Sequence, residues 1–155
     1  MRKILVSLTL IAISALVCEA QTGFRADSAF VLVPRENVRE SRVSGKNLKP
    51  YNLDYFRSVR YLSTQDQIDK IVEWMLEDST GAIDKDIIDS NGKTVYMLLR
   101  FNDDRPGRYQ YLGFQRKPLS VPDKAPGQAY VTMVYMRGKA TPEELSKIFK
   151  HREVK

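Results

Sequence analysis

Apolar residues recur with helical spacing in one segment of the chain. Five of them follow the i, i+3, i+4, i+7, i+8 pattern of a single helical stripe: Ile68, Ile71, Val72, Met75 and Leu76. Thr64 and Gln67 have the spacing of a capping box at the start of this segment, and Gly81 follows its end. The pattern predicts an amphipathic helix that begins after Thr64 and packs its stripe against a core.

A second helix start lies near the end of the chain, where Thr141 is followed by Pro142 and, three residues after the threonine, by Glu144. Runs rich in β-branched and aromatic residues predict strands, and the Asn91–Gly92 pair predicts a tight hairpin between two of them. The predicted strands are 37–45, 57–64, 82–88, 93–101, 109–117 and 129–138, with a further strand or extended arm at 28–34.

These elements predict an α+β domain, with an antiparallel sheet of five or six strands and two helices packed on one face. The segments "SRVSGKNLKPYNLDYF" and "VYMRGKATPEELSKIF" share a strand, a Gly-Lys pair and a leucine followed three places on by an apolar residue. This internal similarity is compatible with two related half-units in one sheet, as in ferredoxin-like folds.

The first twenty residues have the order of a secretory signal peptide. Arg2 and Lys3 precede an apolar run from Ile4 to Val17, and the small residues of Cys18-Glu19-Ala20 follow. We expect cleavage between Ala20 and Gln21, which places the protein in the periplasm or outside the cell. Cys18 raises the alternative of a lipid anchor, but the bulky residues before it disfavour lipid attachment.

Cleavage there leaves one exported domain, residues 21–155, without cysteine and with no stable membrane anchor. Removing Arg2, Lys3 and Glu19 lowers the net charge from +6 to +5. A disulfide framework, a thiolate zinc site and a cysteine nucleophile are excluded for this domain. The lone His151 near the chain end favours neither a catalytic triad nor a metal site. No cofactor and no nucleic-acid partner are expected.

Two segments, "VSGKNLKPYNLDYFRS" and "YVTMVYMRGKATPEELSKIF", resemble a family of small exported proteins from Bacteroidetes that is known only as a domain of unknown function. The resemblance covers most of residues 21–155 in order, and the Ala-Gln cleavage site is similar too. It implies a location in the Gram-negative envelope or outside the cell. It implies no activity, cofactor or catalytic residue.

Two groups of acidic residues suggest specific chemistry. Asp84, Asp86 and Asp89 precede Asn91–Gly92, but Ile87 and Ile88 interrupt the alternating spacing of a calcium loop, so a hairpin turn is the favoured interpretation. Asp103–Asp104 could supply a carboxylate for acid/base hydrolysis, as in glycosidases. Because the sequence brings no second carboxylate near this pair, a solvated turn is favoured there.

Tyrosine and arginine alternate along several predicted strands. A sheet with one face under helices would gather side chains of one parity on its open face. We select these candidates for binding: Arg60, Tyr96, Arg100, Tyr109 and Tyr111. Such side chains bind sugars, carboxylates and protein partners, although cross-strand Tyr and Arg pairs also stabilise an exposed sheet without any ligand.

The sequence therefore predicts a non-catalytic, exported binding or interaction module of the Gram-negative envelope, whose partner is an unidentified protein or glycan. Two alternatives remain open. One is a small hydrolase that uses carboxylates. The other is a structural envelope component whose sheet edge pairs with another chain.

Overall fold

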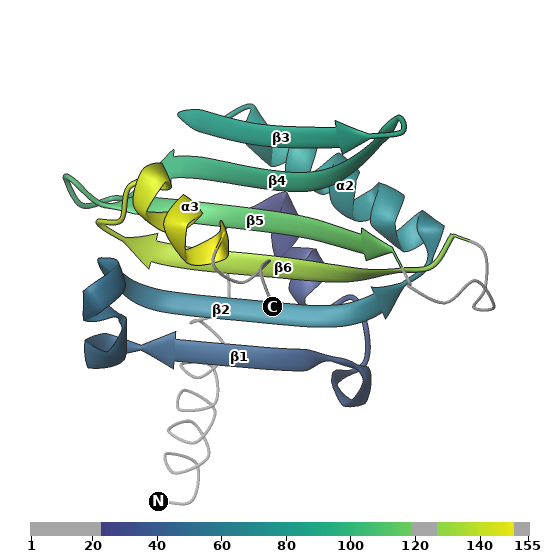
Figure 1. Cartoon of the computed structure of the whole chain (residues 1–155), viewed down its shortest axis with the longest axis horizontal. Coiled ribbons are helices and arrows are strands. Elements are labelled where there is room, and N and C mark those ends of the chain that lie inside the picture. Colours follow the sequence, from purple (N-terminus) through teal and green to yellow (C-terminus); the bar gives the residue numbers. More distant parts are fainter. Residues whose placement is uncertain (1–22, 119–126, 151–155) are drawn as a thin grey trace, which may run out of the picture.

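The computed structural model describes residues 23–118 and 127–150, with side chains through residue 147. The predicted signal peptide, its cleavage bond, His151 and the middle of the proline-rich segment lie outside these residues. The described strands form one antiparallel sheet in the order β1-β2-β6-β5-β4-β3 (Figure 1). Their bounds are β1 Arg39–Ser44, β2 Leu53–Ser63, β3 Asp84–Ser90, β4 Lys93–Asn102, β5 Tyr109–Pro118 and β6 Ala129–Gly138.

Two α-helices, α2 (Gln65–Ser79) and α3 (Pro142–Lys150), accompany the sheet, and three short 3₁₀ helices, η2 (Arg25–Phe30), η3 (Arg35–Asn37) and η4 (Gly45–Tyr51), lie before β2. The predicted α+β class and the antiparallel sheet, expected to have five or six strands, are confirmed, and the described sheet has six. Among the described helices, none combines the length and apolar composition that crossing a membrane requires.

Local sequence signals account for the helix start and the hairpin that were predicted. The Thr64 hydroxyl accepts from the Gln67 backbone N–H at 3.3 Å, and the Gln67 side chain accepts from the Thr64 N–H at 3.0 Å. Asn91 and Gly92 both have positive φ, 52° and 71°, as the tight turn between β3 and β4 requires. These signals act within a few residues, so they can be read directly from the sequence.

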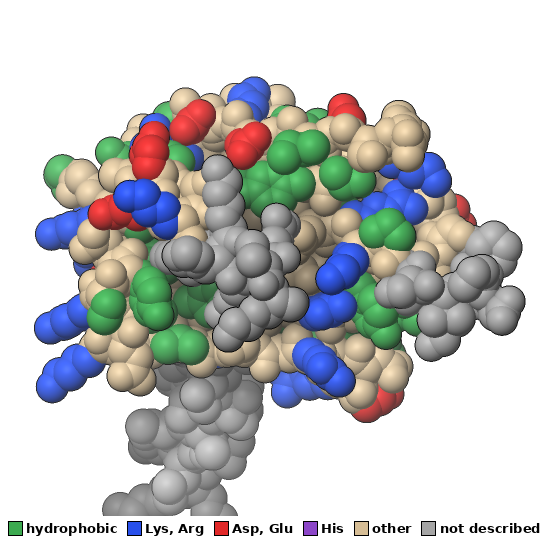
Figure 2. All heavy atoms as spheres, in the orientation of Figure 1, with side chains coloured by type: hydrophobic (Ala, Val, Ile, Leu, Met, Phe, Trp, Pro, Cys, Tyr) green, Lys and Arg blue, Asp and Glu red, His purple; other side chains and the backbone are tan. Residues whose placement is uncertain are grey.

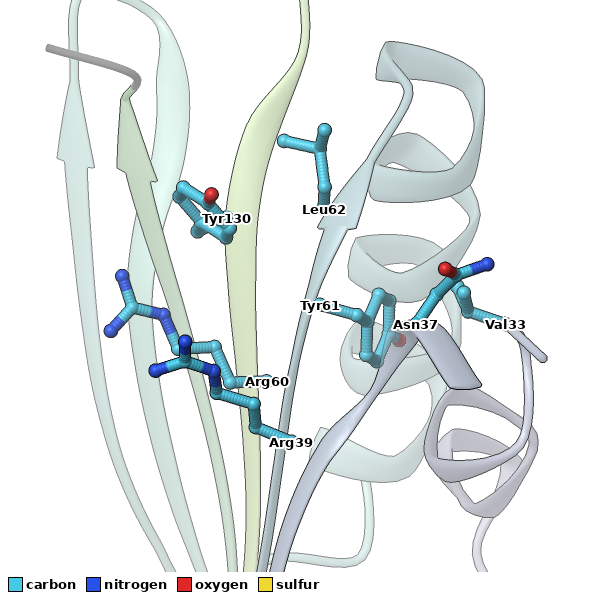
Figure 3. A pocket seen from close by; sticks show the side chains of 7 residues that line it. All are labelled: Val33, Asn37, Arg39, Arg60, Tyr61, Leu62 and Tyr130. Atoms are coloured by element: carbon cyan, nitrogen blue, oxygen red, sulfur yellow. The ribbon is translucent and has the colours of Figure 1, made fainter. Parts of the chain in front are cut away.

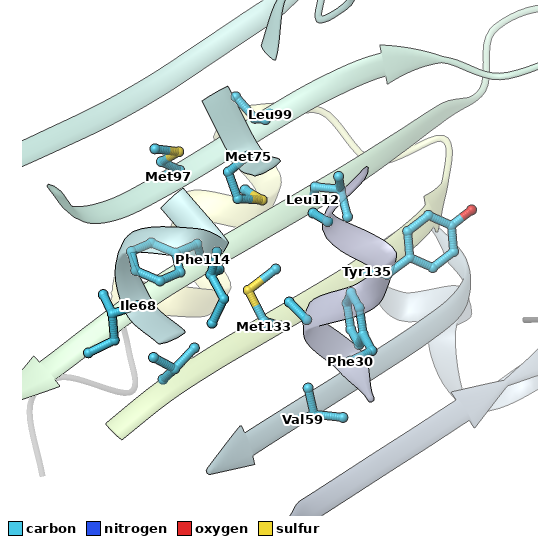
Figure 4. Close-up of a cluster of buried hydrophobic side chains, with 14 of the residues drawn as sticks. Phe30, Val59, Ile68, Met75, Met97, Leu99, Leu112, Phe114, Met133 and Tyr135 are labelled. Carbon is cyan, nitrogen blue, oxygen red and sulfur yellow. The ribbon is translucent and has the colours of Figure 1, made fainter. Parts of the chain in front are cut away.

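One detail of the predicted arrangement differs, because the helices lie on opposite faces of the sheet (Figure 1). Most of the stripe of α2 packs with η2 in the larger core, shown in Figure 4, where Ile68, Met75 and Phe30 meet side chains of the central strands. Leu76, which was predicted to belong to the buried stripe, is 46% exposed. Leu145 of α3 packs on the other face with Tyr111. The face that was expected to be open is therefore partly covered.

The ferredoxin-like arrangement is also not observed. A ferredoxin-like fold contains split βαβ units, in which one antiparallel strand lies between the two parallel strands that a helix joins, and both of its helices lie on one face of the sheet. Here β3, β4, β5 and β6 follow one another as antiparallel neighbours, and β2 pairs antiparallel with β6. Three strands therefore separate β2 from β3, the two strands that α2 joins, and α3 packs on the face opposite to α2.

The segment predicted as a strand or arm at 28–34 begins instead in η2, which buries Ala26, Ala29 and Phe30 against the core. The Asp78 carboxylate at the end of α2 accepts hydrogen bonds from the backbone N–H groups of Arg25 and Ala26, at 2.9 and 2.8 Å. This long-range cap explains why the segment is helical despite its apolar composition.

Alkaline pH should destabilise the fold through three buried tyrosines. Burial raises the pKa of Tyr111 and of Tyr135 from 10.0 to about 12, and it also raises the pKa of Tyr61. Above pH 10 the unfolded chain loses these protons first, so stability is full below pH 10 and falls as the pH rises through the folded values. Circular dichroism against pH should show a cooperative loss of structure above pH 10, accompanied by a step in tyrosinate absorbance. Ionisation of all eight tyrosines without loss of structure would contradict this.

Candidate functional site

The sheet face that carries α3 is divided into a covered half and an open half. In the covered half, Met136, Tyr111 and Val134 are buried with Leu145 of α3. The open half lies toward the opposite end of the strands, where side chains are exposed or half-buried. Because the helix spans only part of the face, a partner can reach the sheet surface beside it.

Strand register places one continuous row of side chains across the open half. The row crosses all six described strands in the order Arg39, Arg60, Thr132, Gln115, Tyr96 and Ile88. Each member is the direct cross-strand neighbour of the next, and all of them point to the same face. The row therefore links the β1 edge of the sheet to the β3 edge.

A pocket of about 540 Å³ lies at the β1 end of this row. β2 pairs with β6 as far as Ser63, whereas its pairing with β1 stops at the Arg60–Arg39 pair. The last three residues of β2 therefore have no β1 neighbour. We call this gap the arginine notch. Its lining residues are Val33, Asn37, Arg39, Arg60, Tyr61, Leu62 and Tyr130 (Figure 3).

Two guanidinium groups dominate the electrostatics of the arginine notch. Arg39 and Arg60 lie directly opposite each other on paired strands, and both side chains extend to the same side (Figure 3). Among the described residues, neither is ion-paired with a carboxylate, and Glu40 of β1 pairs instead with Arg42 and Arg57 at 2.7 and 2.8 Å. Like charges directly opposite on neighbouring strands destabilise a sheet, so this pair favours an anion between or above the two groups.

The remaining side chains of the arginine notch suit a ligand with both charge and an apolar body. The Arg60 guanidinium lies 4.8 Å from the centre of the Tyr130 ring, which holds it in place by a cation–π contact. Leu62 supplies an apolar wall, and Lys117 is the cross-strand neighbour of Tyr130 on the next strand. Figure 2 shows Lys and Arg side chains on the right of this face and also along its left edge, whereas Asp and Glu lie mostly at the upper left.

The structure separates the five predicted binding residues into different environments. Arg60 lines the arginine notch, and Tyr96 is half-buried in the open row. Arg100 lies 4.9 Å from the centre of the Tyr109 ring and 3.7 Å from the Asp84 carboxylate, in the half that α3 covers. Tyr111 is 0% exposed. Its hydroxyl donates to the Ala140 carbonyl at 2.5 Å, so it is a core residue that a partner cannot contact.

Sequence reasoning did not find Arg39 or Tyr130 as candidates. In the last strand Tyr135 and Arg137 have the opposite parity to Tyr130 and lie on the α2 face. The alternation of β6 contained a usable signal, because Tyr130 and Thr132 share one parity. Choosing the correct parity required knowing which face α2 covers, and that depends on packing between distant segments.

The Asp103–Asp104 pair, considered above for acid/base chemistry, belongs to an ion-pair cluster. Arg137 donates to both oxygens of Asp103 at 2.9 and 2.8 Å and to Asp104 at 2.9 Å. The Arg108 Nε lies 3.7 Å from Asp103, and Arg108 also pairs with Asp54. Hydrogen bonding from Arg137 lowers the pKa of Asp103. A general acid needs a raised pKa, so this carboxylate is suited to tying the β4–β5 turn to β6 instead.

The acidic residues of 84–90 lie along the extended strand β3, as the hairpin interpretation requires. Asp84 pairs with Arg100, and Asp89 accepts from the Thr94 hydroxyl at 2.8 Å. Within the described part of the chain, no three side chains of the metal-binding types converge on one point. The strand conformation spreads these carboxylates apart and does not wrap them around an ion.

Comparison with known proteins identifies a family that matches this chain, but it assigns no activity. The model of a family of unknown function, DUF6108, matches residues 13–149, which is most of the chain. Neither the comparison with curated proteins nor the comparison with solved structures gave a match.

Proposed function

Because the chain belongs to DUF6108, a family of unknown function, we propose its function from the site itself: it is a non-catalytic binding module for a partner that carries carboxylates. The observation that carries this proposal is the opposed pair Arg39 and Arg60, which has no carboxylate partner among the described residues. The partner is a protein or a glycan, since acidic side chains and uronic sugars present the same charged group.

Guanidinium groups bind carboxylates with two parallel hydrogen bonds, and such charge-assisted bonds are stronger than neutral ones. Two arginines on adjacent strands can hold one carboxylate between them or two successive carboxylates of a repeating chain. The apolar wall of Leu62 and the ring of Tyr130 then contact the body of the ligand. A pocket of about 540 Å³ has room for a side chain or one sugar unit.

A binding role is favoured over hydrolysis by the chemistry of the acidic residues. Asp103 is held ionised by Arg137, and the side chain of Asp103 is only 2% exposed. The arginine notch itself is lined by cations, aromatic rings and apolar groups, with no carboxylate among its lining residues. The described residues thus offer a place to hold an anion and no matched acid and base beside it.

We propose that the module works after export, in the periplasm or outside the cell. This rests on the order of residues 1–20, with a cationic head, an apolar run and small residues before Gln21. Carboxylate-rich glycans and acidic protein surfaces are accessible partners there. Cell fractionation followed by mass spectrometry tests this part, because recovery of the protein only in the cytoplasm, with residues 1–20 still attached, would overturn it.

Replacing Arg39 and Arg60 together with alanine should abolish most binding while leaving the fold intact. Each charge-assisted contact contributes about 1.5 kcal/mol or more, so affinity should fall roughly tenfold for each arginine. The measurement is an NMR titration of the purified protein with oligoglutamate in one arm and oligogalacturonate in the other, which distinguishes the two sources of carboxylate. Rising salt should weaken either complex.

A Lys46→Ala, Lys49→Ala variant is the matched control, because it removes two positive charges from η4 and leaves the arginine notch unchanged. It should bind nearly as tightly as the unmodified protein. Equal losses in both double variants would indicate attraction to net charge alone. If neither ligand shifts signals of residues in the arginine notch, the proposed function is wrong.

A further inference from the structure

The β3 edge of the sheet carries an unusual concentration of exposed apolar side chains. Of the six large apolar side chains that are exposed in the described residues, three lie in this edge strand or directly before it: Ile83, Ile87 and Ile88. Ile87 and Ile88 are 39% and 49% exposed on successive positions of β3. The Ile83 N–H donates to the Arg100 carbonyl at 2.8 Å, which extends the edge by one residue before the strand.

β3 has only one strand neighbour, β4, so its outer side is a row of backbone groups open to another strand (Figure 1). All seven of its residues are exposed. Charged side chains usually protect such an edge from pairing. On β3 the charged side chains are spaced so that one register of strand pairing is favoured over registers shifted by one or two residues.

We propose that β3 pairs antiparallel with β3 of a second copy of this chain, in the register that matches all seven residues. In that register Ile87 lies on the two-fold axis opposite its own copy. Lys85 lies opposite Asp89 of the other chain. The two-fold axis generates a second, identical Lys85–Asp89 pair. Asp86 meets Ile88, and Asp84 meets Ser90, so no carboxylate is opposite another.

Neighbouring registers are disfavoured by like charges. A shift of one residue in one direction brings Asp84 opposite Asp89, and in the other direction it brings Asp86 opposite Asp89, in each case twice by symmetry. A shift of two residues either places Asp86 opposite its own copy or loses both lysine–aspartate pairs. Like charges directly opposite on paired strands are destabilising, so the charge pattern selects the full overlap.

The side chains that would meet are available for these contacts. The Lys85 ammonium has no carboxylate partner among the described residues, and Asp89 uses one oxygen to accept from Thr94 at 2.8 Å. Asp84 is already balanced by Arg100. Pairing would also cover Ile87, which shares the α2 face with Met97 of β4 and is 39% exposed at the edge of the sheet.

The resulting dimer has a defined arrangement of its two ligand sites. Antiparallel pairing of identical edges keeps the two α3 faces on the same side of one twelve-stranded sheet. The arginine notches then lie at opposite ends, roughly 50 Å apart at a strand spacing of about 4.8 Å. Two sites on one face would let the dimer bind a repeating partner with avidity. The pairing itself does not depend on what the notch binds.

Charge reversal tests the proposed interface by sedimentation of the purified protein over a range of concentrations. The unmodified protein should show a concentration-dependent dimer. Lys85→Glu and Asp89→Lys should each weaken it by about tenfold or more, because each replaces two attractive pairs with repulsive ones. The combined variant Lys85→Glu, Asp89→Lys should restore dimerisation. Lys46→Glu is the matched control and should leave the dimer unchanged.

A cysteine placed on the axis tests the register. In a Cys18→Ser background, Ile87→Cys should form a disulfide-linked dimer rapidly on mild oxidation, whereas Lys46→Cys should not. A protein that stays monomeric at its highest soluble concentration would overturn the proposal. The β3 edge would then be available only to a strand of a different protein. A dimer that is insensitive to both charge reversals, or in which the double variant fails to restore association, would also overturn it.

Discussion

Replacing Gly138 with alanine should lower the free energy of unfolding by about 3 kcal/mol, the upper range for forcing an extra methyl group into a packed site. A Cβ at this position would lie 2.5 Å from the Asn52 carbonyl oxygen and 2.7 Å from the Leu53 Cα. Both neighbours are backbone atoms, which cannot rotate away. The clash must therefore be relieved by moving the strands apart.

The expected damage extends to α3, because the same contact holds the start of that helix. The Asn52 carbonyl accepts from the N–H groups of Lys139 and Ala140 at 2.8 and 2.9 Å, and the Asn52 side chain donates to Glu144 at 2.9 Å. Moving Asn52 loosens all three bonds. Near-ultraviolet circular dichroism should thus lose intensity along with thermal stability.

Gly113→Ala is the matched control for this prediction. Gly113 is buried on the neighbouring strand β5, but a Cβ there would meet the Val134 Cβ at 3.4 Å, which is an ordinary contact. The control should change stability by no more than about 1 kcal/mol, the full span of strand propensities. Equal destabilisation by both substitutions would show that loss of strand glycine, and not the close approach to Asn52, is responsible.

The contact at Gly138 also shows where prediction from sequence ends. The start of α2 at Thr64, the hairpin at Asn91–Gly92 and the last strand were all predicted, since each is decided by interactions within a few residues. The contact between Gly138 and Asn52, which holds the start of α3, joins residues that lie far apart in the chain. No periodicity in the sequence reports that contact, and the two helices were therefore expected on one face.

The candidate site was predictable to a similar extent. Alternation placed Arg60 and Tyr96 on one face correctly, because side-chain parity is a local property of a strand. Arg39 gains its significance only from lying opposite Arg60, and the register of β1 and β2 sets that pairing. Tyr111 has the same parity as the open row, but it lies nearer the other end of β5, under α3. Parity identifies a face, and only packing identifies which part of that face is open.

The placement of Tyr111 leads to the second large expected effect. Tyr111→Ala should lower the free energy of unfolding by about 3–5 kcal/mol, because it removes a fully buried ring from the cluster with Met136 and Leu145. Tyr111→Phe keeps the ring and removes only the hydrogen bond to Ala140, so about 1–2 kcal/mol should be lost. Chemical denaturation, monitored by circular dichroism, measures both.

Tyr130→Ala is the informative comparison, since Tyr130 is a half-buried tyrosine on the same face, next to Arg60 in the arginine notch. It should cost about 1 kcal/mol or less in stability and should weaken binding of oligoglutamate or oligogalacturonate. Tyr111→Phe should lower stability and leave binding unchanged, because the Tyr111 hydroxyl faces the protein interior. If Tyr111→Phe left stability unchanged but abolished binding, α3 would have to move away from the sheet when the partner binds. The ligand would then occupy the covered half of the face, and the arginine notch would be only its margin.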